Sequence, residues 1–458
     1  MALKKKPVTG MKDVLPAEMQ VREYVMEKIR ETYKSFGFSQ IETPCVEHIE
    51  NLTSKQGGDN EKLIFKILKR GDKLDVAAAQ SEEDVVDGGL RYDLTLPLSR
   101  YYAGHASELP APFKALQMGS VWRADRPQKG RFRQFVQCDI DILGDATSLA
   151  EIELILATTT ALGRICPGNS FAVRINDRGI LKGMAAYCGF PEESYDQIFI
   201  ILDKMDKIGM EGVKAELKEA GFADEQVEKY LGLFADFGAG SGGKEDEAAR
   251  DGEAGDGAVS GETARGEAEK RGERASEKVR RLGALLSEAG AVDPQVPEGL
   301  AHIMDTVLEV AETSFKLVFD PTLVRGMSYY TGTIFEVAME GFGGSVAGGG
   351  RYDKMIGRFT GMDTPACGFS IGFERIVTIL LDAGFTVPGA GEKKAYLFEK
   401  GVSQEVLSQV LREASKEREA GVQVLVAQMN KNKKFQKEQL MKDGYGQFKE
   451  FYRDALKR

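Results

Sequence analysis

The chain has 458 residues, 42% of them hydrophobic and 29% charged, which is enough apolar material for two or three domains with cores of their own. Its 71 acidic residues outnumber its 61 basic ones, and the net charge of -10 argues against a protein that binds nucleic acid over its whole surface. A local basic patch is still compatible with this charge.

Cysteines and histidines are scattered along the chain. The five cysteines include no CxxC pair and the three histidines lie far apart, so we predict neither a disulfide framework nor a zinc site. The basic first residues are followed by no apolar stretch, and no apolar window approaches about 18 residues. We therefore expect a cytoplasmic protein that contacts no membrane.

The first third of the chain predicts an α+β fold with antiparallel strands. Apolar residues at i+4 spacing predict an amphipathic helix over 17–36, and 38–44 predicts a strand closed by a proline. Aromatic and β-branched residues over 113–123 and 132–143 predict a long antiparallel hairpin with a basic tip.

The next segments predict a helix over 149–162, a strand over 170–175 and then a helical insertion. Within the insertion, residues 238–277 include eleven acidic and six basic side chains, and Val259 is the only large apolar one. Such a stretch cannot offset the entropy of ordering, so we expect a flexible excursion there.

Residue patterns predict further strands over 315–319 and 334–338, and a helix is expected from Ile371 onward. Beyond Pro388 the order strand, helix, strand, helix predicts a small α/β domain. Residues 421–458 contain nine basic and four acidic side chains, so this domain is the candidate for electrostatic contact with nucleic acid.

Arginines are concentrated at the turn of the predicted hairpin, between Trp122 and Phe135. The guanidinium group presents a planar fork that matches phosphate oxygens, so one interpretation is a triphosphate site. The alternative is an ordinary solvated tip, because runs of charge are usually exposed.

The glycine-rich segment 343–353 resembles a phosphate loop but lacks the GxxxxGK[ST] spacing. Its glycines could equally allow a strand to approach a ligand closely or form a bulge. Arg375 follows among apolar residues, and a buried arginine needs an anion, either a carboxylate such as Glu374 or a ligand phosphate.

Polar residues alternate with apolar ones in two further places. Gln137, Asp139 and Asp141 are expected to share one strand face, and so are Asp93 and Thr95. Each could be hydrogen-bonded within a sheet, whereas together they would suit the ammonium group of an amino acid.

Taken together, these segments resemble the class II aminoacyl-tRNA synthetases and, within that class, the histidyl-tRNA synthetase family. The helix and strand that end at Pro44 resemble motif 1, the hairpin from Arg123 to Phe135 resembles motif 2, and 368–375 resembles motif 3. More specific are LVRGMSYYTG at 323–332 and GGRYD at 349–353, which resemble the two histidine signatures. The resemblance covers nearly the whole chain outside the acidic excursion.

Three features depart from the family pattern. Ser328 stands where the first signature often has an aspartate, and Asp125 stands where motif 2 usually has a glutamate. The C-terminal domain resembles the family's anticodon-binding domain only over its first two strands and helices.

The resemblance implies an antiparallel sheet of six or seven strands with flanking helices. It divides the chain into a catalytic core at 1–177 and 313–388, an insertion at 178–312, and a shortened domain of the anticodon-binding kind at 389–458. It also implies a homodimer, because motif 1 builds the dimer interface in this class.

The implied activity is the ATP-dependent ligation of L-histidine to tRNA(His) through histidyl-adenylate, with ATP bound as its Mg²⁺ complex and no resident metal. The rate of such a reaction depends on the positioning of the reactants and on stabilisation of the charge that develops in the transition state. The implied catalytic residues are Arg123 and Arg325; the ATP-binding residues are Arg123, Arg131, Phe135 and Arg375; the histidine-binding residues are Asp93, Thr95, Gln137, Asp141, Arg325, Tyr329, Tyr330 and Tyr352; the tRNA-binding residues are Arg126 and Gln128.

A second interpretation is the catalytically silent relative of these enzymes, which acts as a regulatory subunit of ATP phosphoribosyltransferase in histidine biosynthesis. That subunit shares the core but generally lacks the anticodon-binding domain. Arg123, Arg325 and Arg375, together with the basic C-terminal domain, favour the synthetase.

Overall fold

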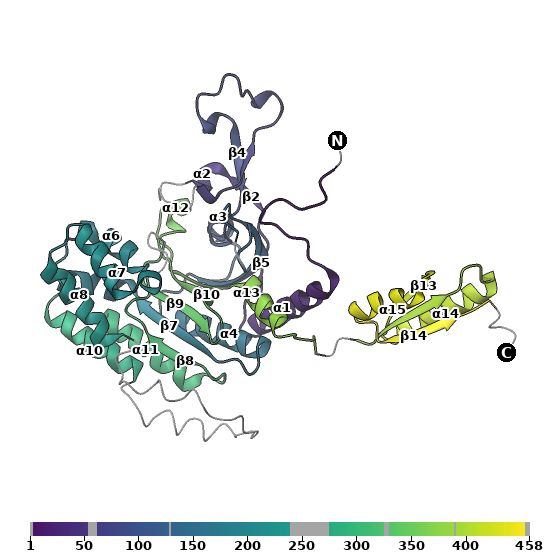
Figure 1. Ribbon diagram of the computed structural model, residues 1–458. Coiled ribbons are helices and arrows are strands. Elements are labelled where there is room, and N and C mark those ends of the chain that lie inside the picture. The colour runs from purple at the N-terminus through teal and green to yellow at the C-terminus, as the bar shows by residue number, and fades with distance from the viewer. Residues whose placement is uncertain are drawn as a thin grey trace. The chain divides into compact units, whose positions relative to one another are not determined.

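A computed structural model describes residues 3–53, 62–127, 130–238, 274–324, 329–388 and 391–453. The chain forms two compact units, one with residues 8–11 and 28–376 and the other with residues 1–7, 12–27 and 377–458. Figure 1 shows the elements of each unit along the chain. Among the described residues, no helix is long and apolar enough to span a membrane.

The larger unit is built on one eight-stranded sheet. Its strand order is β1-β5-β6-β11-β10-β9-β7-β8. The strands are β1 (Ser39–Gln40), β5 (Phe113–Trp122), β6 (Gln134–Leu143), β7 (Phe171–Asp177), β8 (Lys316–Phe319), β9 (Thr333–Met339), β10 (Ser345–Arg351) and β11 (Ala366–Ile371). The six inner strands are antiparallel, whereas β1 pairs with β5 and β8 pairs with β7 in parallel.

The sheet corrects the prediction of six or seven antiparallel strands, because it is mixed and has eight. Both parallel strands are edge strands and both are short: β1 has two residues and β8 has four. The strand predicted over 38–44 is therefore reduced to two residues. A strand's direction depends on the neighbour it pairs with, and the alternation of its side chains carries no information about that neighbour.

The long hairpin forms as predicted. Its two ten-residue strands pair in continuous register from Phe113 opposite Leu143 to Trp122 opposite Gln134. Side chains on such strands alternate between the two faces of the sheet, so consecutive residues of β6 have opposite surroundings. One face of β6 carries the polar residues of the site, and the other carries Cys138 and Ile140, which are fully buried.

Helix α4 (Leu149–Ile165) covers one face of the sheet and lies against β11. Helix α1 (Pro16–Ser35) follows the predicted i+4 pattern, and the Tyr33 hydroxyl near its end lies 3.5 Å from Thr158 Oγ1 of α4. Tyr33 and Ile29 are fully buried. The amphipathic pattern of α1 thus identifies its buried face correctly.

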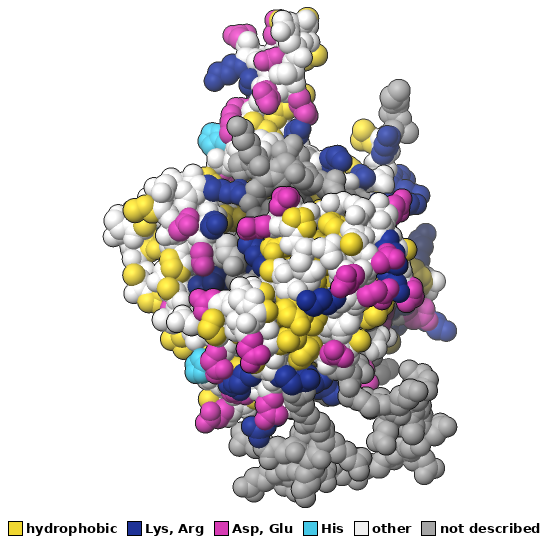
Figure 2. All heavy atoms as spheres, turned by 90° about the vertical axis from the view of Figure 1, so that its left-hand side faces the viewer, with side chains coloured by type: hydrophobic (Ala, Val, Ile, Leu, Met, Phe, Trp, Pro, Cys, Tyr) yellow, Lys and Arg dark blue, Asp and Glu magenta, His cyan; other side chains and the backbone are white. Residues whose placement is uncertain are grey.

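The insertion is helical, as predicted, and Figure 1 shows its helices together at the β7 and β8 side of the sheet. They are α5 (Arg178–Tyr187), α6 (Tyr195–Leu202), α7 (Met205–Glu219), α8 (Asp224–Phe237), α10 (Ala275–Glu288) and α11 (Gln295–Val310). The predicted excursion ends too late, because α10 already begins at Ala275 and Ser276 is buried. Residues 239–273 lie outside the described part of the chain. Figure 2 views this side of the molecule, where acidic and basic side chains are interspersed with small apolar patches.

A small arm extends from the same unit (Figure 1) and was not predicted. It is a three-stranded antiparallel sheet in the order β2-β4-β3, with Ile49, Leu52, Ile64 and Val86 in its core. Its strands are β2 (Val46–His48), β3 (Lys66–Leu68) and β4 (Val86–Leu90), and the helices in this region are α2 (Ile49–Leu52), α3 (Thr95–His105) and α12 (Gly357–Thr360).

The C-terminal α/β domain follows α13 (Phe373–Asp382) and has a three-stranded parallel sheet in the order β13-β12-β14. Its elements are β12 (Lys393–Phe398), α14 (Gln404–Glu419), β13 (Gln423–Gln428), α15 (Lys433–Lys442) and β14 (Gln447–Phe451). The order strand, helix, strand, helix is as predicted, and β14 adds a strand that was not. Phe451 of β14 packs with Tyr396 and Val410 in the domain's core.

Candidate active site

A cavity of about 990 Å³ opens on the sheet face that carries the polar residues of β6. Most of the predicted site residues line it: Asp93, Thr95, Arg123, Arg131, Phe135, Gln137, Asp141, Tyr329, Tyr330, Tyr352 and Arg375. Arg126 is described but is not part of this lining. Arg325 and Gln128 lie outside the described residues.

Buried carboxylates form one end of the cavity. Asp139 and Asp141 project from the same face of β6 and are both almost inaccessible to solvent. The Tyr352 hydroxyl donates to Asp141 Oδ1 at 2.6 Å, and the Ser370 hydroxyl of β11 donates to Asp139 Oδ1. Within the described part of the chain, Asp141 Oδ2 and Gln137 Oε1 are buried without a hydrogen-bond partner. Two buried acceptors therefore remain available to a ligand that donates hydrogen bonds.

Asp93 and Thr95 also reach this end of the cavity, but the backbone conformation that carries them differs from the predicted one. They do not share a strand face: β4 ends at Leu90, and Thr95 begins helix α3. Asp93 Oδ1 accepts a hydrogen bond from the Leu96 amide at 3.2 Å, which satisfies one of the free amides at the start of the helix. An alternation over four residues was too short to distinguish a strand from a capped helix start.

The carboxylates are held in an environment that disfavours their ionised forms. Burial raises the pKa of Asp139 to about 7, against the hydrogen bond from Ser370, and the nearby Asp93 adds to the rise. Burial and the charge of Asp139 likewise raise the pKa of Asp141 well above its usual range, and burial raises that of Asp93. A cationic ligand would offset both the burial and the mutual repulsion.

Asp139 shares the predicted polar face of its strand but is not among the histidine-binding residues that the family resemblance implies. Its position on β6, two residues from both Gln137 and Asp141, was the signal that could have included it. The structure places it in the cavity lining, with Gln137 Nε2 donating to its Oδ2 at 3.3 Å.

Three tyrosines close the cavity beside these carboxylates. The ring centroid of Tyr329 lies 5.5 Å from that of Tyr352 and 4.9 Å from that of Tyr330. Burial, together with the charge of Asp93, raises the pKa of Tyr329 well above its usual range, so its hydroxyl stays protonated as a hydrogen-bond donor. This end of the cavity therefore combines aromatic surface with hydrogen-bond donors and acceptors.

Arginines line another part of the cavity. Arg123 Nε donates to the Tyr92 carbonyl at 2.8 Å, and its guanidinium carbon lies 5.2 Å from the centroid of the Phe135 ring. Arg375 Nη1 donates to the backbone carbonyl of Ser345 and, at 3.2 Å, to its hydroxyl. One cavity thus contains carboxylates and guanidinium groups, which suits a ligand pair with separate cationic and anionic groups.

The glycine run has a packing role between strands that neither of its two interpretations included. It forms strand β10, and a Cβ on Gly349 would lie 2.0 Å from the Gly368 carbonyl oxygen of β11. Its glycines therefore permit the close approach of two strands in the floor of the cavity. A register shift between Ser345 and Ala347 also gives β10 an irregularity where it pairs with β9.

The sheet, its hairpin arginines and its carboxylate pocket agree with the class II aminoacyl-tRNA synthetase fold that the sequence predicted. Residues 10–250 and 269–376 match the family model described as histidyl-tRNA synthetase. The chain is 45% identical over 378 residues to a histidine–tRNA ligase of Leifsonia xyli subsp. xyli, which covers 82% of this chain and 80% of that relative. It is 36% identical over 382 residues to a histidine–tRNA ligase of Porphyromonas gingivalis, with 81% and 75% covered.

Solved structures agree with these relatives. A crystal structure of histidyl-tRNA synthetase from Nostoc sp. PCC 7120 matches with a TM-score of 0.73 at 26% identity, covering 97% of this chain and 90% of that one. A structure named as an ATP phosphoribosyltransferase regulatory subunit/histidyl-tRNA synthetase from Bacillus halodurans C matches with a TM-score of 0.71 at 20% identity, with 99% of each chain covered, which shows a shared fold alone. The chain belongs to the histidyl-tRNA synthetase family.

Proposed function

We propose that the chain activates L-histidine with ATP to form histidyl-adenylate and then transfers the histidyl group to tRNA(His). The observation that carries the proposal is that one cavity, lined by described residues, brings buried carboxylates and the unpaired acceptor atoms of Asp141 and Gln137 beside arginines. Histidine is cationic at its α-ammonium and donates from its imidazole, whereas ATP is anionic along its phosphates. Membership of the family supports the same pairing of ligands.

The carboxylate end is proposed to bind histidine. Asp93, Thr95 and Gln137 would receive the α-ammonium group, and we add Asp139 to this set because of its position in the cavity. Asp141 and Tyr330 would contact the two imidazole nitrogens, with Tyr329 and Tyr352 closing the pocket. An amino acid without an imidazole would leave these buried groups unpaired, which is the physical basis of selectivity.

The arginines are proposed to bind ATP, which arrives as its Mg²⁺ complex. Arg123 would contact the α-phosphate and Arg375 the far phosphates, with Phe135 and Arg375 on either side of adenine and Arg131 nearby. Arg325 would contact the α-phosphate from the opposite side, a role that comes from the family resemblance. These positive groups stabilise the charge that develops as the histidine carboxylate attacks the α-phosphorus and pyrophosphate leaves.

The tRNA would be bound by Arg126 and Gln128 at the hairpin turn and by the basic C-terminal domain. We further propose that the protein acts as a homodimer in the cytoplasm, where aminoacylation takes place. These assignments rest on the resemblance and on charge.

Histidine-dependent exchange between ATP and pyrophosphate tests the proposal directly. We expect exchange with histidine and background rates with the other amino acids. A folded protein without exchange would instead indicate the regulatory-subunit function. Charging of tRNA(His) with labelled histidine tests the second step.

A further inference from the structure

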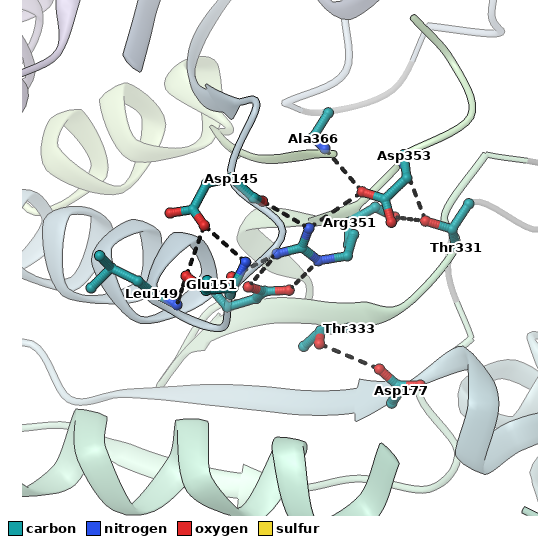
Figure 3. Close-up of polar contacts among 10 residues, drawn as sticks. Asp145, Leu149, Glu151, Asp177, Thr331, Thr333, Arg351, Asp353 and Ala366 are labelled. Carbon is teal, nitrogen blue, oxygen red and sulfur yellow. Dashed lines mark hydrogen bonds and ion pairs between the residues drawn. The ribbon is translucent and has the colours of Figure 1, made fainter. Parts of the chain in front are cut away.

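A polar network on the sheet face covered by α4 joins distant parts of the chain (Figure 3). Arg351, the last residue of β10, makes two parallel hydrogen bonds to Glu151 in the first turn of α4, at 2.6 Å from Nε to Oε1 and 2.7 Å from Nη2 to Oε2. Its Nη1 and Nη2 groups also donate to the carbonyls of Asp145 at 3.1 Å and Thr147 at 3.0 Å. The guanidinium group is thereby fixed in position and in orientation.

This ion pair is largely buried, since the Glu151 side chain is 3% exposed and that of Arg351 is 12% exposed. A buried ion pair contributes little net stability compared with an apolar pair of the same size, because both charges must be desolvated. Its two-pronged geometry does, however, fix direction in a way that an apolar contact does not. The pair is therefore suited to holding the end of β10 in one place.

The network continues into the first histidine signature through Thr331. The Thr331 amide donates to the Arg351 carbonyl at 2.7 Å, and its hydroxyl accepts a hydrogen bond from the Asp353 amide at 3.1 Å. Asp353 Oδ1 in turn accepts from the Ala366 amide at 2.9 Å and from Arg351 Nη1 at 3.3 Å. The two signature segments and the start of β11 are thus joined to one another.

Both signature segments supply tyrosines to the cavity. Tyr352 directly follows Arg351, and its side chain reaches the cavity face, where it donates to Asp141. Tyr329 and Tyr330 directly precede Thr331 and line the same cavity. Arg351, Glu151 and Thr331 are not part of the cavity lining, whereas the tyrosines beside Arg351 and Thr331 line it.

We infer that Arg351, Glu151 and Thr331 are positioning residues that set the tyrosine side of the histidine pocket without touching substrate. The inference rests on the proposed function, because histidine is the ligand whose binding they would tune. Arg123 and Phe135, proposed for ATP, come from the β5–β6 hairpin and make none of these contacts. Weakening the network should therefore weaken the binding of histidine more than the binding of ATP.

The first test compares Thr331→Val with Thr331→Ser in histidine-dependent pyrophosphate exchange. Valine keeps the size of threonine but cannot accept the hydrogen bond from the Asp353 amide, whereas serine can. We expect Thr331→Val to raise the KM for histidine by about tenfold and the KM for ATP by no more than about twofold. Thr331→Ser should keep the wild-type values.

Glu151→Gln provides a second variant, which keeps the shape of the side chain and removes its charge. It should also raise the KM for histidine more than the KM for ATP, and its thermal unfolding shows whether it folds. If Glu151→Gln fails to fold, the threonine pair still decides the question. Equal changes in both KM values, or none, in an active Thr331→Val protein would overturn the inference and leave the proposed function standing. Absence of exchange in the wild-type protein would overturn the proposed function and the inference with it.

Discussion

Gly368 of β11 lies directly opposite Asp141 of β6, so closely that a Cβ on Gly368 would be 2.0 Å from Asp141 Oδ1. That oxygen is also the one to which Tyr352 donates. The absence of a side chain at Gly368 therefore leaves the space in which the Asp141 carboxylate can point into the cavity.

Gly368→Ala should displace the Asp141 carboxylate and break its hydrogen bond with Tyr352. Loss of one buried hydrogen bond that leaves its acceptor unpaired costs about 1 to 3 kcal/mol, so we expect the KM for histidine to rise roughly 5- to 150-fold. Pyrophosphate exchange at varied histidine concentration measures this change. Gly343→Ala is the matched control, because a Cβ on Gly343 meets no atom within 4 Å. A normal histidine KM in Gly368→Ala would contradict the role of this contact.

Asp139 should make the unliganded protein less stable as the pH rises. Because the pKa of Asp139 is raised in the folded state to about 7, its contribution to stability is greatest below the ordinary aspartate pKa of about 4 and is lost as the pH rises through about 7. Asp139→Asn cannot ionise, so its free energy of unfolding relative to wild type should be higher at pH 8 than at pH 5. Denaturant unfolding at both pH values measures the difference, and a difference independent of pH would show that Asp139 does not titrate in this range.

Arg325 yields the sharpest prediction of the sequence resemblance. If it contacts the α-phosphate in the transition state, Arg325→Ala should lower the adenylation rate by roughly 10²- to 10³-fold, or about 3 to 4 kcal/mol, with much smaller changes in ATP and histidine affinity. Arg325→Lys should rescue only partly, since a point charge cannot replace the guanidinium fork. Single-turnover adenylation separates the two effects, and an equal loss in ground-state binding would make Arg325 a substrate-binding residue only.

Two deletions test where the acidic excursion ends. Removing 239–273 and joining the ends with a short flexible linker should leave adenylation and thermal stability nearly unchanged, because Val259 is the only large apolar side chain in that stretch. The family model also passes over residues 251–268. Extending the deletion through Glu277 removes the first turn of α10 and its buried Ser276, and should lower the melting temperature by several degrees. Equal melting temperatures for the two deletions would contradict this boundary.

The basic surface of the C-terminal domain should affect tRNA and not adenylation. Lys431, Lys434 and Lys442, on or next to α15, are exposed. Replacing all three with glutamine should raise the KM for tRNA(His) about three- to tenfold at moderate salt and reduce its salt dependence. Pyrophosphate exchange by the same variant is the internal control. Unchanged charging kinetics would remove this surface from the tRNA-binding site.

Local patterns in the sequence were sufficient for several parts of this protein. The strand pattern on either side of the arginine turn extends over ten residues on each side, and the i+4 apolar spacing extends along α1. Each pattern repeats often enough to specify one structure, and both structures are observed. The signature segments 323–332 and 349–353 identified the family, which the comparisons confirm. These properties depend on residues that are neighbours along the chain.

Other features depended on contacts between distant residues. The two-residue strand β1, the parallel direction of both edge strands and the capped start of α3 at Asp93 were predicted wrongly or not at all. The elevated pKa of Asp139 arises from burial and from Asp93, which is distant in sequence. Glu151 and Arg351, which pair across 200 residues, gave no signal of their connection. Side-chain periodicity reports which face of an element is buried, but strand pairing, desolvation and ion pairing are set by the partner that the tertiary fold brings to that face.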